Sequence, residues 1–383
     1  MAEAYIVAAV RTAGGRRNGR LMGWHPVDLA GAVLSEVAAR SGIDPAAIDD
    51  VIMGCVGQAG EQALHVGRNA VLASTLPDSV PAVSIDRQCG SSQQAIQFAA
   101  QAVMSGTQDV VIAAGVEHMS RVPMGTSVAG ARPFSERVLA RYGVKGFSQF
   151  TGAEMIARKY GQDRAMVDGY ALESHRRAAA AVERGDFADE ILVLDVDTPD
   201  GAVRHAVDEG IRFDASLEGL GALKTLAEGG VVTAGNASQI CDGASAVMVV
   251  SEAALKAHGL TPLARIVNLT VSAGDPVIML EEPLFATDKA LKRAGMSIGD
   301  IDLYEVNEAF APVPLAWLHH VGGDPARLNV NGGAIALGHP LGASGTKLMT
   351  TLVHALRKRG LRYGLQTMCE GGGIANVTIV EAL

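Results

Sequence analysis

Cys89 has the sequence surroundings of a reactive thiol. It stands in DRQCGSS (residues 86–92), after the strand-like residues 83–85 and before a segment with helical periodicity. The free backbone NH groups and the dipole at a helix N-terminus stabilise a thiolate, which is the form of cysteine that attacks a carbonyl carbon. The adjacent Gly90 leaves room for a substrate. We therefore expect a nucleophile here, the alternative being a small buried core residue.

His339 lies in the loop NVNGGAIALGHPLGASG (residues 329–345), which contains five glycines. Such a loop allows backbone conformations that other residues avoid, and Pro340 fixes the main chain directly after the imidazole. We expect a histidine held in a cleft, the alternative being a capping or core histidine. A base close to Cys89 would complete a Cys/His nucleophilic pair.

Two further segments offer groups for acid-base and oxyanion chemistry. Cys369 ends an expected strand and begins CEGGG (residues 369–373), whose backbone NH groups could bind an oxyanion. No C-x-x-C spacing is present, which favours proton transfer over disulfide exchange. The motif NEAF (residues 307–310) follows another expected strand, where Asn307 could orient a water or a carbonyl or simply cap a helix.

The composition indicates a well-packed α/β protein that positions these groups. Of the 383 residues, 48% are hydrophobic and 19% are charged, which excludes a disordered chain. The length suits two or three domains. Aromatic residues make up only 4% and there are 45 glycines, so we expect a core of small aliphatic side chains with close backbone approaches.

Charge and cysteine usage exclude several kinds of partner. The formal charge of −9 disfavours nucleic acid and anionic membranes, and Arg16, Arg17 and Arg20 form only a short basic patch. The four cysteines are far apart in sequence, which disfavours disulfides and a metal site. No apolar run reaches the roughly 18 residues of a membrane span. We expect a cytoplasmic protein with reduced thiols.

An internal repeat divides the chain into two similar β/α halves. Residues 39–53 and 292–306 share a helix end, a glycine, an Ile-Asp pair and an apolar run, and residues 4–7 resemble residues 264–267. The helix expected after Cys89 matches the helix expected after the His339 loop. Duplication is the economical interpretation.

The texture of the sequence changes between the two repeats, which predicts an insertion. We expect residues 1–119 with 235–263 to form the N-terminal half, residues 120–234 an inserted loop domain, and residues 264–383 the C-terminal half. Inserted loop segments of this kind often carry ligand contacts.

These motifs together resemble the thiolase family, the acetyl-CoA acetyltransferases and 3-ketoacyl-CoA thiolases. The resemblance rests on CGS at 89–91, NEAF, CEGGG and above all NGGAIALGHP at 331–340, and it covers essentially the whole chain. It implies a duplicated, five-layered α/β/α/β/α fold with an inserted loop domain. Residues 147–152 lack the His-Met of short-chain biosynthetic members, and the segments 93–94 and 120–122 are similar to degradative actinobacterial thiolases, some acting on steroid side chains.

The resemblance also implies a role for each candidate residue. Cys89 would accept an acyl group after activation by His339, which would line an oxyanion hole with a water held by Asn307. Cys369 would exchange a proton with CoA sulfur or the substrate α-carbon, and backbone NH groups of Cys89 and Gly371 would form a second oxyanion hole. The reaction implied is thiolysis of a 3-ketoacyl-CoA to acetyl-CoA and a shortened acyl-CoA, or the reverse Claisen condensation.

Coenzyme A would be a substrate, with no bound cofactor and no metal. By resemblance, the CoA contacts fall on five residues: Arg212, Ala234, Ser238, Ala309 and Phe310. A homo-oligomer, either a dimer or a dimer of dimers, is implied as well.

Two alternatives share the fold. A ketosynthase-like condensing enzyme would use a different partner set in place of Cys369, and a non-catalytic lipid-binding protein would not need Cys89, Asn307, His339 and Cys369 together. The acyl chain and the physiological direction are left open by the motifs.

Overall fold

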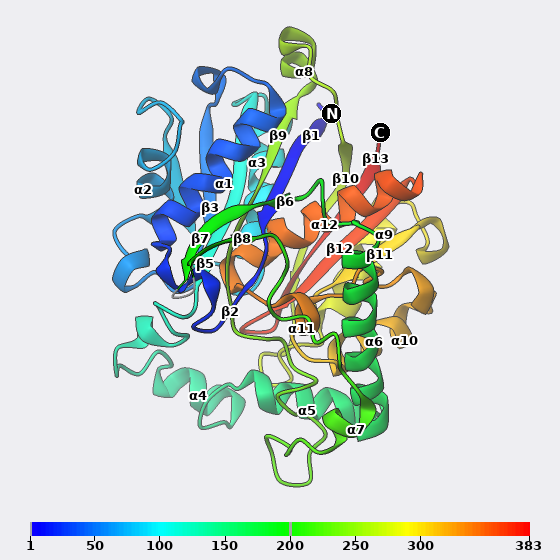
Figure 1. Cartoon of the computed structure of the whole chain (residues 1–383). Coiled ribbons are helices and arrows are strands. Elements are labelled where there is room, and N and C mark those ends of the chain that lie inside the picture. Colours follow the sequence, from blue (N-terminus) through cyan, green and yellow to red (C-terminus); the bar gives the residue numbers. More distant parts are fainter. Residues whose placement is uncertain (1, 199–200) are drawn as a thin grey trace.

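One continuous sheet runs through the protein in the computed structural model, which describes residues 2–198 and 201–383 (Figure 1). Its main path has the order β11-β12-β13-β10-β1-β9-β5-β3-β4. The strands of the first half are β1 (Ala4–Thr12), β3 (Asp50–Gly54), β4 (Ala82–Ile85), β5 (Val110–His118) and β9 (Cys241–Ser251). The strands of the second half are β10 (Ala264–Ala273), β11 (Leu303–Val306), β12 (Tyr363–Glu370) and β13 (Ile374–Ala382).

The strand order shows the duplication directly. Read outward from the centre, the first half runs β1-β9-β5-β3 and the second half runs β10-β13-β12-β11. The two halves meet where β1 and β10 pair antiparallel, with Tyr5 opposite Arg265 and Ile6 opposite Ala264. These are the openings that the repeat in the sequence matches, so the expected pair of β/α halves is confirmed.

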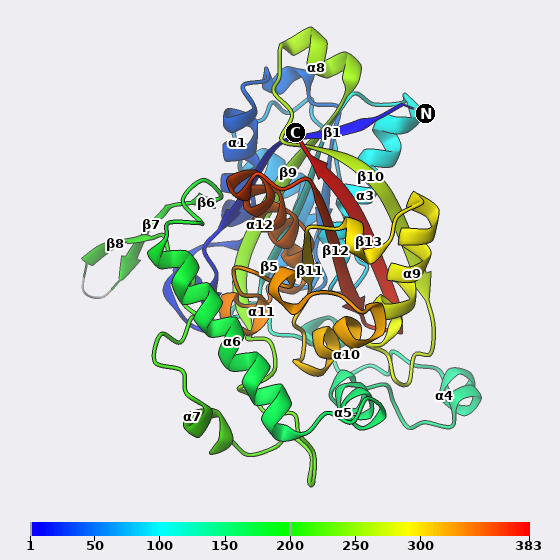
Figure 2. The same cartoon turned by 90° about the vertical axis from the view of Figure 1, so that its right-hand side faces the viewer.

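Helices form three layers around the two halves of the sheet (Figures 1 and 2). The middle layer consists of α3 (Ser91–Ser105) and α12 (Ser344–Arg359), which pack on each other and on strands of both halves. The outer layers consist of α1 (Pro26–Ser41) and α2 (Val66–Leu72) on the first half, and α9 (Glu282–Ala294) and α10 (Pro312–Val321) on the second. The five-layered α/β/α/β/α arrangement is therefore confirmed.

The segment between β5 and β9 contains most of the remaining elements, and Figure 2 shows its helices beneath and beside the layered core. They are α4 (Glu136–Tyr142), α5 (Gln149–Lys159), α6 (Arg164–Glu183), α7 (Leu217–Gly221), β6 (Ile191–Leu192) and the hairpin of β7 (Leu194–Thr198) and β8 (Gly201–His205). Shorter elements elsewhere are β2 (Gly15–Arg16), α8 (Glu252–His258) and α11 (Ala334–Leu337). The boundaries of the loop domain at 120 and 234 stay a prediction.

A buried ion cluster fastens this segment to the core. Arg11, on β1, is fully buried, and its guanidinium lies 2.6 Å from Glu190 and 2.8 Å from Asp208. Buried charges of this kind depend on one another, because removing one partner leaves the other unpaired in a low dielectric. The cluster therefore ties residues 190 and 208 to the first strand.

The two helices of the middle layer approach each other closely where α12 begins. A Cβ built on Gly345 would lie 2.0 Å from the backbone nitrogen of Gln93. At the adjacent positions, the backbone NH of Thr346 donates to the Ser92 hydroxyl at 3.0 Å. Ser92 thus connects the start of α3 to the start of α12 through this hydrogen bond.

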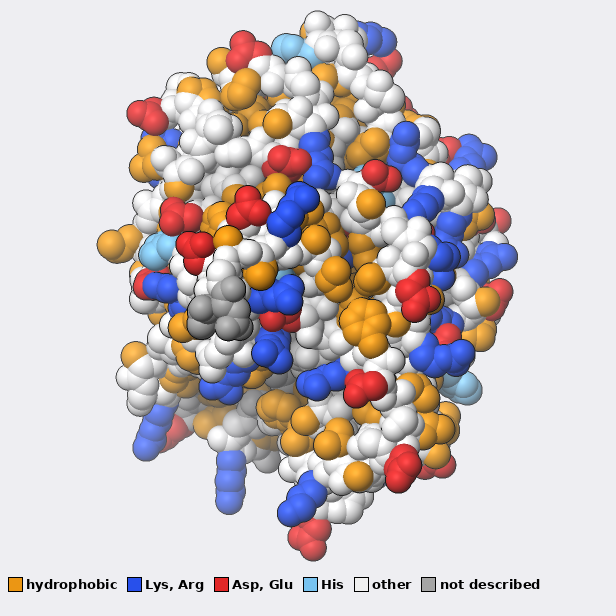
Figure 3. Space-filling model, in the orientation of Figure 1, with side chains coloured by type: hydrophobic (Ala, Val, Ile, Leu, Met, Phe, Trp, Pro, Cys, Tyr) orange, Lys and Arg blue, Asp and Glu red, His pale blue; other side chains and the backbone are white. Residues whose placement is uncertain are grey.

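On the face of the molecule that Figure 3 shows, Lys and Arg side chains are interspersed with Asp and Glu side chains. Within residues 2–198 and 201–383, no helix is long and apolar enough to cross a bilayer.

The contact between α3 and α12 predicts that Gly345→Ala lowers the free energy of unfolding by roughly 1–3 kcal/mol, because the added methyl meets backbone that cannot move aside. Gly169→Ala is the matched control: Gly169 lies within α6 and a Cβ there meets nothing within 4 Å, so the variant should be about 0.5–1 kcal/mol more stable. Urea unfolding measures both, and equal stability of Gly345→Ala and the wild type would contradict the prediction.

Candidate active site

Four segments converge at one end of the layered core, and corresponding places in the two halves supply them. Cys89 precedes α3 in the first half, and His339 precedes α12 in the second. Asn307 follows β11 directly, and Cys369 is the penultimate residue of β12. The duplication therefore places the nucleophile candidate and the base candidate before the two helices that pack against each other.

A strained turn presents Cys89. The residue before it, Gln88, has φ +48°, a left-handed conformation that side chains other than glycine rarely adopt. The turn is held by two hydrogen bonds, from the Gln88 NH to Asp86 at 2.6 Å and from the Arg87 NH to the Ser91 hydroxyl at 2.9 Å. The strain is consistent with a backbone that is fixed in order to aim the thiol.

The protonation state of Cys89 differs from the expectation. The helix start was expected to favour the thiolate, but burial raises the pKa of Cys89 to about 12, and the charge of Glu370 acts in the same direction. The backbone NH of Cys89 opposes this shift without overcoming it. The expectation is wrong for the resting protein, because desolvation of the anion outweighs the helix terminus. A neutral thiol needs a base to remove its proton.

His339 is a neutral base with a defined tautomer. Its Nδ1 lies 2.5 Å from the Ser344 hydroxyl, which itself donates to the Pro340 carbonyl at 2.9 Å. Its Nε2 lies 3.4 Å from the Asn307 amide nitrogen, which has only protons to offer. The proton therefore sits on Nδ1, and Nε2 carries the lone pair. Burial, assisted by the charge of Lys347, lowers the pKa of His339 to about 3, so the ring is uncharged.

Cys369 and the glycines after it lie beside the Cys89 turn. Cys369 is buried, and burial together with the charge of Cys89 raises the pKa of its thiol well above the usual range. A Cβ built on Gly371 would lie 3.0 Å from the Gln88 side-chain oxygen, so the glycine loop packs against this turn. The structure thus brings Cys89, Cys369 and Gly371 into one neighbourhood, as the sequence predicts.

The five residues predicted to contact CoA line a single cleft of about 520 Å³. The cleft is lined by Arg212, Ala234, Ser238, Ala309 and Phe310, and also by His339. Arg16 and Arg17, which the sequence shows only as a short basic patch, lie at the same cleft. Among the described residues no carboxylate lies within 4 Å of the Arg17 or Arg212 guanidinium, so both charges are available to an anionic ligand.

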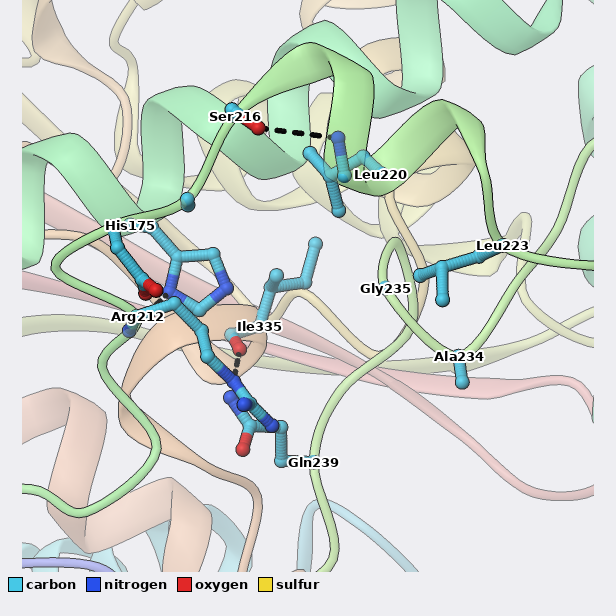
Figure 4. Close-up of a pocket in the computed structure, with 12 residues that line it drawn as sticks. His175, Arg212, Ser216, Leu220, Leu223, Ala234, Gly235, Gln239 and Ile335 are labelled. Carbon is cyan, nitrogen blue, oxygen red and sulfur yellow. Dashed lines mark hydrogen bonds between the residues drawn. The ribbon is translucent and has the colours of Figure 1, made fainter.

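A second pocket of about 380 Å³ adjoins the cleft and shares Arg212, Ala234 and Gln239 with it (Figure 4). Two hydrogen bonds hold its wall in place. The Gln239 side-chain amide donates to the Ile335 carbonyl at 2.7 Å, and the Arg212 backbone NH donates to His175 Nδ1 at 3.1 Å. The cleft and the pocket together could hold an extended ligand with a negatively charged group near Arg212.

Glu308 does not line the cleft, and its carboxylate instead holds neighbouring segments together. Its carboxylate accepts hydrogen bonds from the Tyr170 and Ser174 hydroxyls, the Asn329 amide and the Ile335 NH, at 2.7 to 3.0 Å. This network ties the end of β11 to α6 and to the loop before His339.

Glu370 is a buried acid close to Cys89, and the sequence reasoning missed it. It is fully buried, and no donor from the described residues reaches either carboxyl oxygen. A Cβ built on Gly90 would lie 2.0 Å from Glu370 Oε1, so the carboxyl contacts the residue after Cys89. Burial raises the pKa of Glu370 to about 8, although Arg87 opposes the shift. A charged residue directly after Cys369 and directly before three glycines was the available signal.

The pKa of Glu370 predicts a pH dependence of Cys89 reactivity. Below about pH 8 the carboxyl is neutral, and above it the carboxylate disfavours the neighbouring thiolate. Glu370→Gln should therefore alkylate at Cys89 roughly fivefold faster than wild type at pH 9.5 and at the same rate at pH 7. Iodoacetamide kinetics with peptide mapping measure this. Glu381→Gln, at the far end of the β12–β13 hairpin, is the control, and identical profiles for Glu370→Gln and wild type would refute the coupling.

Comparison with known proteins identifies the family of this chain. The model of the thiolase N-terminal domain matches residues 4–253, and that of the thiolase C-terminal domain matches residues 260–382. The chain is 53% identical to the steroid 3-ketoacyl-CoA thiolase FadA6 of Mycobacterium tuberculosis, over all of this chain and 95% of that protein. It is 41% identical to a 3-ketoacyl-CoA thiolase of Yersinia pestis over the full length of both.

Solved structures are similar over the whole chain as well. Human mitochondrial 3-ketoacyl-CoA thiolase superposes with a TM-score of 0.91, and Bacillus anthracis acetyl-CoA acetyltransferase with a TM-score of 0.92. Each is 38% identical, and each match covers all of this chain and 99% of the other. With two family domains matched in order and relatives aligned from end to end, this chain belongs to the thiolase family.

Proposed function

We propose that this protein is a 3-ketoacyl-CoA thiolase that works in the degradative direction. It transfers an acyl group from a 3-ketoacyl-CoA to CoA through an acyl-enzyme on Cys89. The single observation that carries the proposal is the hydrogen-bonded series Asn307, His339 and Ser344, which leaves His339 Nε2 with a lone pair at the cleft that all five expected CoA contacts line.

In the first half-reaction, the Cys89 thiol gives its proton to His339 Nε2, and its sulfur attacks the 3-keto carbon. The bond between C2 and C3 breaks, and the electron pair stays on C2 as the enolate of acetyl-CoA. Cys369 gives its proton to C2, so acetyl-CoA leaves and Cys89 carries the shortened acyl group. The backbone NH groups of Cys89 and Gly371 stabilise the oxygen on C3, and His339 with a water held by Asn307 stabilises the enolate oxygen.

In the second half-reaction, the Cys369 thiolate takes the proton of CoA sulfur, and that sulfur attacks the acyl carbon. Cys89 leaves as the thiol with the proton returned by His339. Every proton removed in the first half-reaction is thus replaced in the second. The reaction needs no redox equivalent and no resident cofactor, and CoA enters only as a substrate.

The cleft suggests how CoA binds. The phosphates of CoA pair with Arg16, Arg17 and Arg212, which lie at a cleft of an otherwise acidic protein. The pantetheine then passes Ser238 and Phe310 toward His339, and the nucleotide end extends toward the pocket shown in Figure 4.

The acyl group is large and apolar in this proposal. The cleft is lined by Met119, Met124, Phe150, Leu226 and Ile240, with no carboxylate among its lining residues. These side chains suit a bulky hydrocarbon rather than an acetyl group. The 53% identity to a protein named for steroid 3-ketoacyl-CoA supports a steroid-derived acyl chain. Assembly as a dimer or a dimer of dimers, and a cytoplasmic location, belong to the same proposal.

Thiolysis of a panel of 3-ketoacyl-CoAs, from acetoacetyl through long-chain to steroid-derived, tests the function. We expect a bulky member to give the highest kcat/KM, and Cys89→Ala to lower kcat at least about a thousandfold and to show no acyl adduct by mass spectrometry. Cys241→Ala, which removes a buried thiol that has no role in the proposed mechanism, should keep the activity. Turnover by Cys89→Ala, or no turnover of any member by the wild type, would overturn the proposal.

Binding of CoA is tested separately at Arg212. Arg212→Met should raise the KM for CoA about tenfold and leave kcat within about twofold, because the lost ion pair acts on bound and reacting CoA alike. The difference should shrink at high salt. Arg293→Met, an exposed arginine on α9, is the control and should behave as wild type. An unchanged KM for Arg212→Met would remove this residue from the CoA site.

A further inference from the structure

A small internal cavity is lined by Asn307. Its volume is about 10 Å³ and all of its lining residues are buried. It is enclosed by the end of β11, the loop at 332–338 and the first turns of α12. Ser344, which holds His339 Nδ1, lines it too. The cavity therefore adjoins both residues that hydrogen-bond to the His339 ring.

Two buried acceptors belong to this cavity and lack a protein partner. Among the described residues, no donor reaches Glu305 Oε2 or Asn307 Oδ1, and both side chains are at most 2% exposed. The residues stand two apart at the end of β11, so their side chains project to the same side of the strand. A buried acceptor without a donor is destabilising, so two of them at one cavity call for a partner.

Glu305 has a proton to share. Burial raises the pKa of its carboxyl well above the usual range, and the charges of Glu308 and Glu190 act in the same direction, against Arg177 and Arg359. This shift favours the neutral carboxylic acid, which can donate one hydrogen bond as well as accept. Direct donation to Asn307 is not seen, so the two groups need an intermediary.

The cavity has the size and polarity for one water molecule. A volume of about 10 Å³ available to water centres is near the lower limit for a single water, and a buried water needs two to four polar partners. We propose that one ordered water occupies this cavity, accepts a hydrogen bond from Glu305 and donates one to Asn307 Oδ1, and that Glu305 is thereby a positioning residue for Asn307.

The consequence is a fixed orientation of the Asn307 amide. With Oδ1 held by this water, the amide nitrogen must face His339, where it lies 3.4 Å from Nε2. Without the water, the amide loses the group that distinguishes its two ends and can turn over, which would place an acceptor where oxyanion chemistry requires a donor. This role of Asn307 rests on the proposed function, whereas occupancy of the cavity does not.

Occupancy is tested directly by a crystal structure of the wild type at about 1.5 Å resolution. We expect one water peak in the cavity, within hydrogen-bonding distance of both Glu305 and Asn307. A dry cavity, or a water that contacts only one of the two residues, overturns the proposal whatever the activity of the protein. Failure of the proposed function would instead appear as a filled cavity in a protein that cleaves no 3-ketoacyl-CoA.

The positioning role is tested with a matched pair of variants. Glu305→Gln keeps the size and a donor, and we expect its kcat to stay within about twofold of wild type. Glu305→Met keeps the size without a hydrogen bond, and we expect kcat to fall about tenfold, a fraction of the effect of deleting an oxyanion donor. The KM for CoA should be unchanged in both, because the contacts proposed for CoA do not include the Asn307 amide.

Equal kcat values for the two variants, or a change in KM with kcat intact, would refute the positioning role. Thermal unfolding checks that both variants are folded at the assay temperature. If Glu305→Met does not fold, crystal structures of the wild type and of Glu305→Gln decide instead. A water peak in both structures supports the positioning role. Loss of the water in Glu305→Gln with full activity would refute it.

Discussion

The close approach of α3 and α12 is the constraint on which the rest of the structure depends. The nucleophile candidate stands just before one helix and the base candidate just before the other, so the distance between the helix starts sets the geometry of the site. Gly345 permits this distance because any Cβ there would meet the backbone of Gln93. The bond between Thr346 and Ser92 then fixes it. Duplication explains the arrangement, since each half contributes the corresponding helix.

Burial imposes a second constraint, which is electrical. The thiols of Cys89 and Cys369 and the ring of His339 are all neutral in the resting protein, because desolvation penalises each charged form. Burial also raises the pKa values of the Glu305 and Glu370 carboxyls, which favours their neutral forms. Neutral groups can pass protons between thiol, imidazole and substrate. Their resting forms carry no charge, which would be costly to bury in a low dielectric. The charged side chains of Arg16, Arg17 and Arg212 lie at the cleft, where they can pair with an anionic ligand.

Much of the site could be predicted because its residues stand in loops with unusual sequences. Cys89, Asn307, His339 and Cys369 were identified from turns, glycines and strand ends, and the cleft contains every expected CoA contact. Glu370 and Glu305 were missed. Each lies in a strand within two residues of a recognised residue, where a lone acid looks the same in sequence whether its side chain faces solvent or the core. The thiolate expected at Cys89 was wrong for the same reason, because the extent of burial is not visible in local sequence.

The sequence by itself determined the duplication and the order of the β/α halves. It also determined the four segments that contain Cys89, Asn307, His339 and Cys369. All of these depend on periodicity and on residues that stand near each other along the chain. Only the tertiary structure decided which charges and cavities surround them. Arg16 and Arg17 join the cleft, Ser92 bonds to the second half, and Glu305 shares a cavity with Asn307. The physical reason is that pKa values, cavities and unpaired acceptors depend on distant residues brought together by packing.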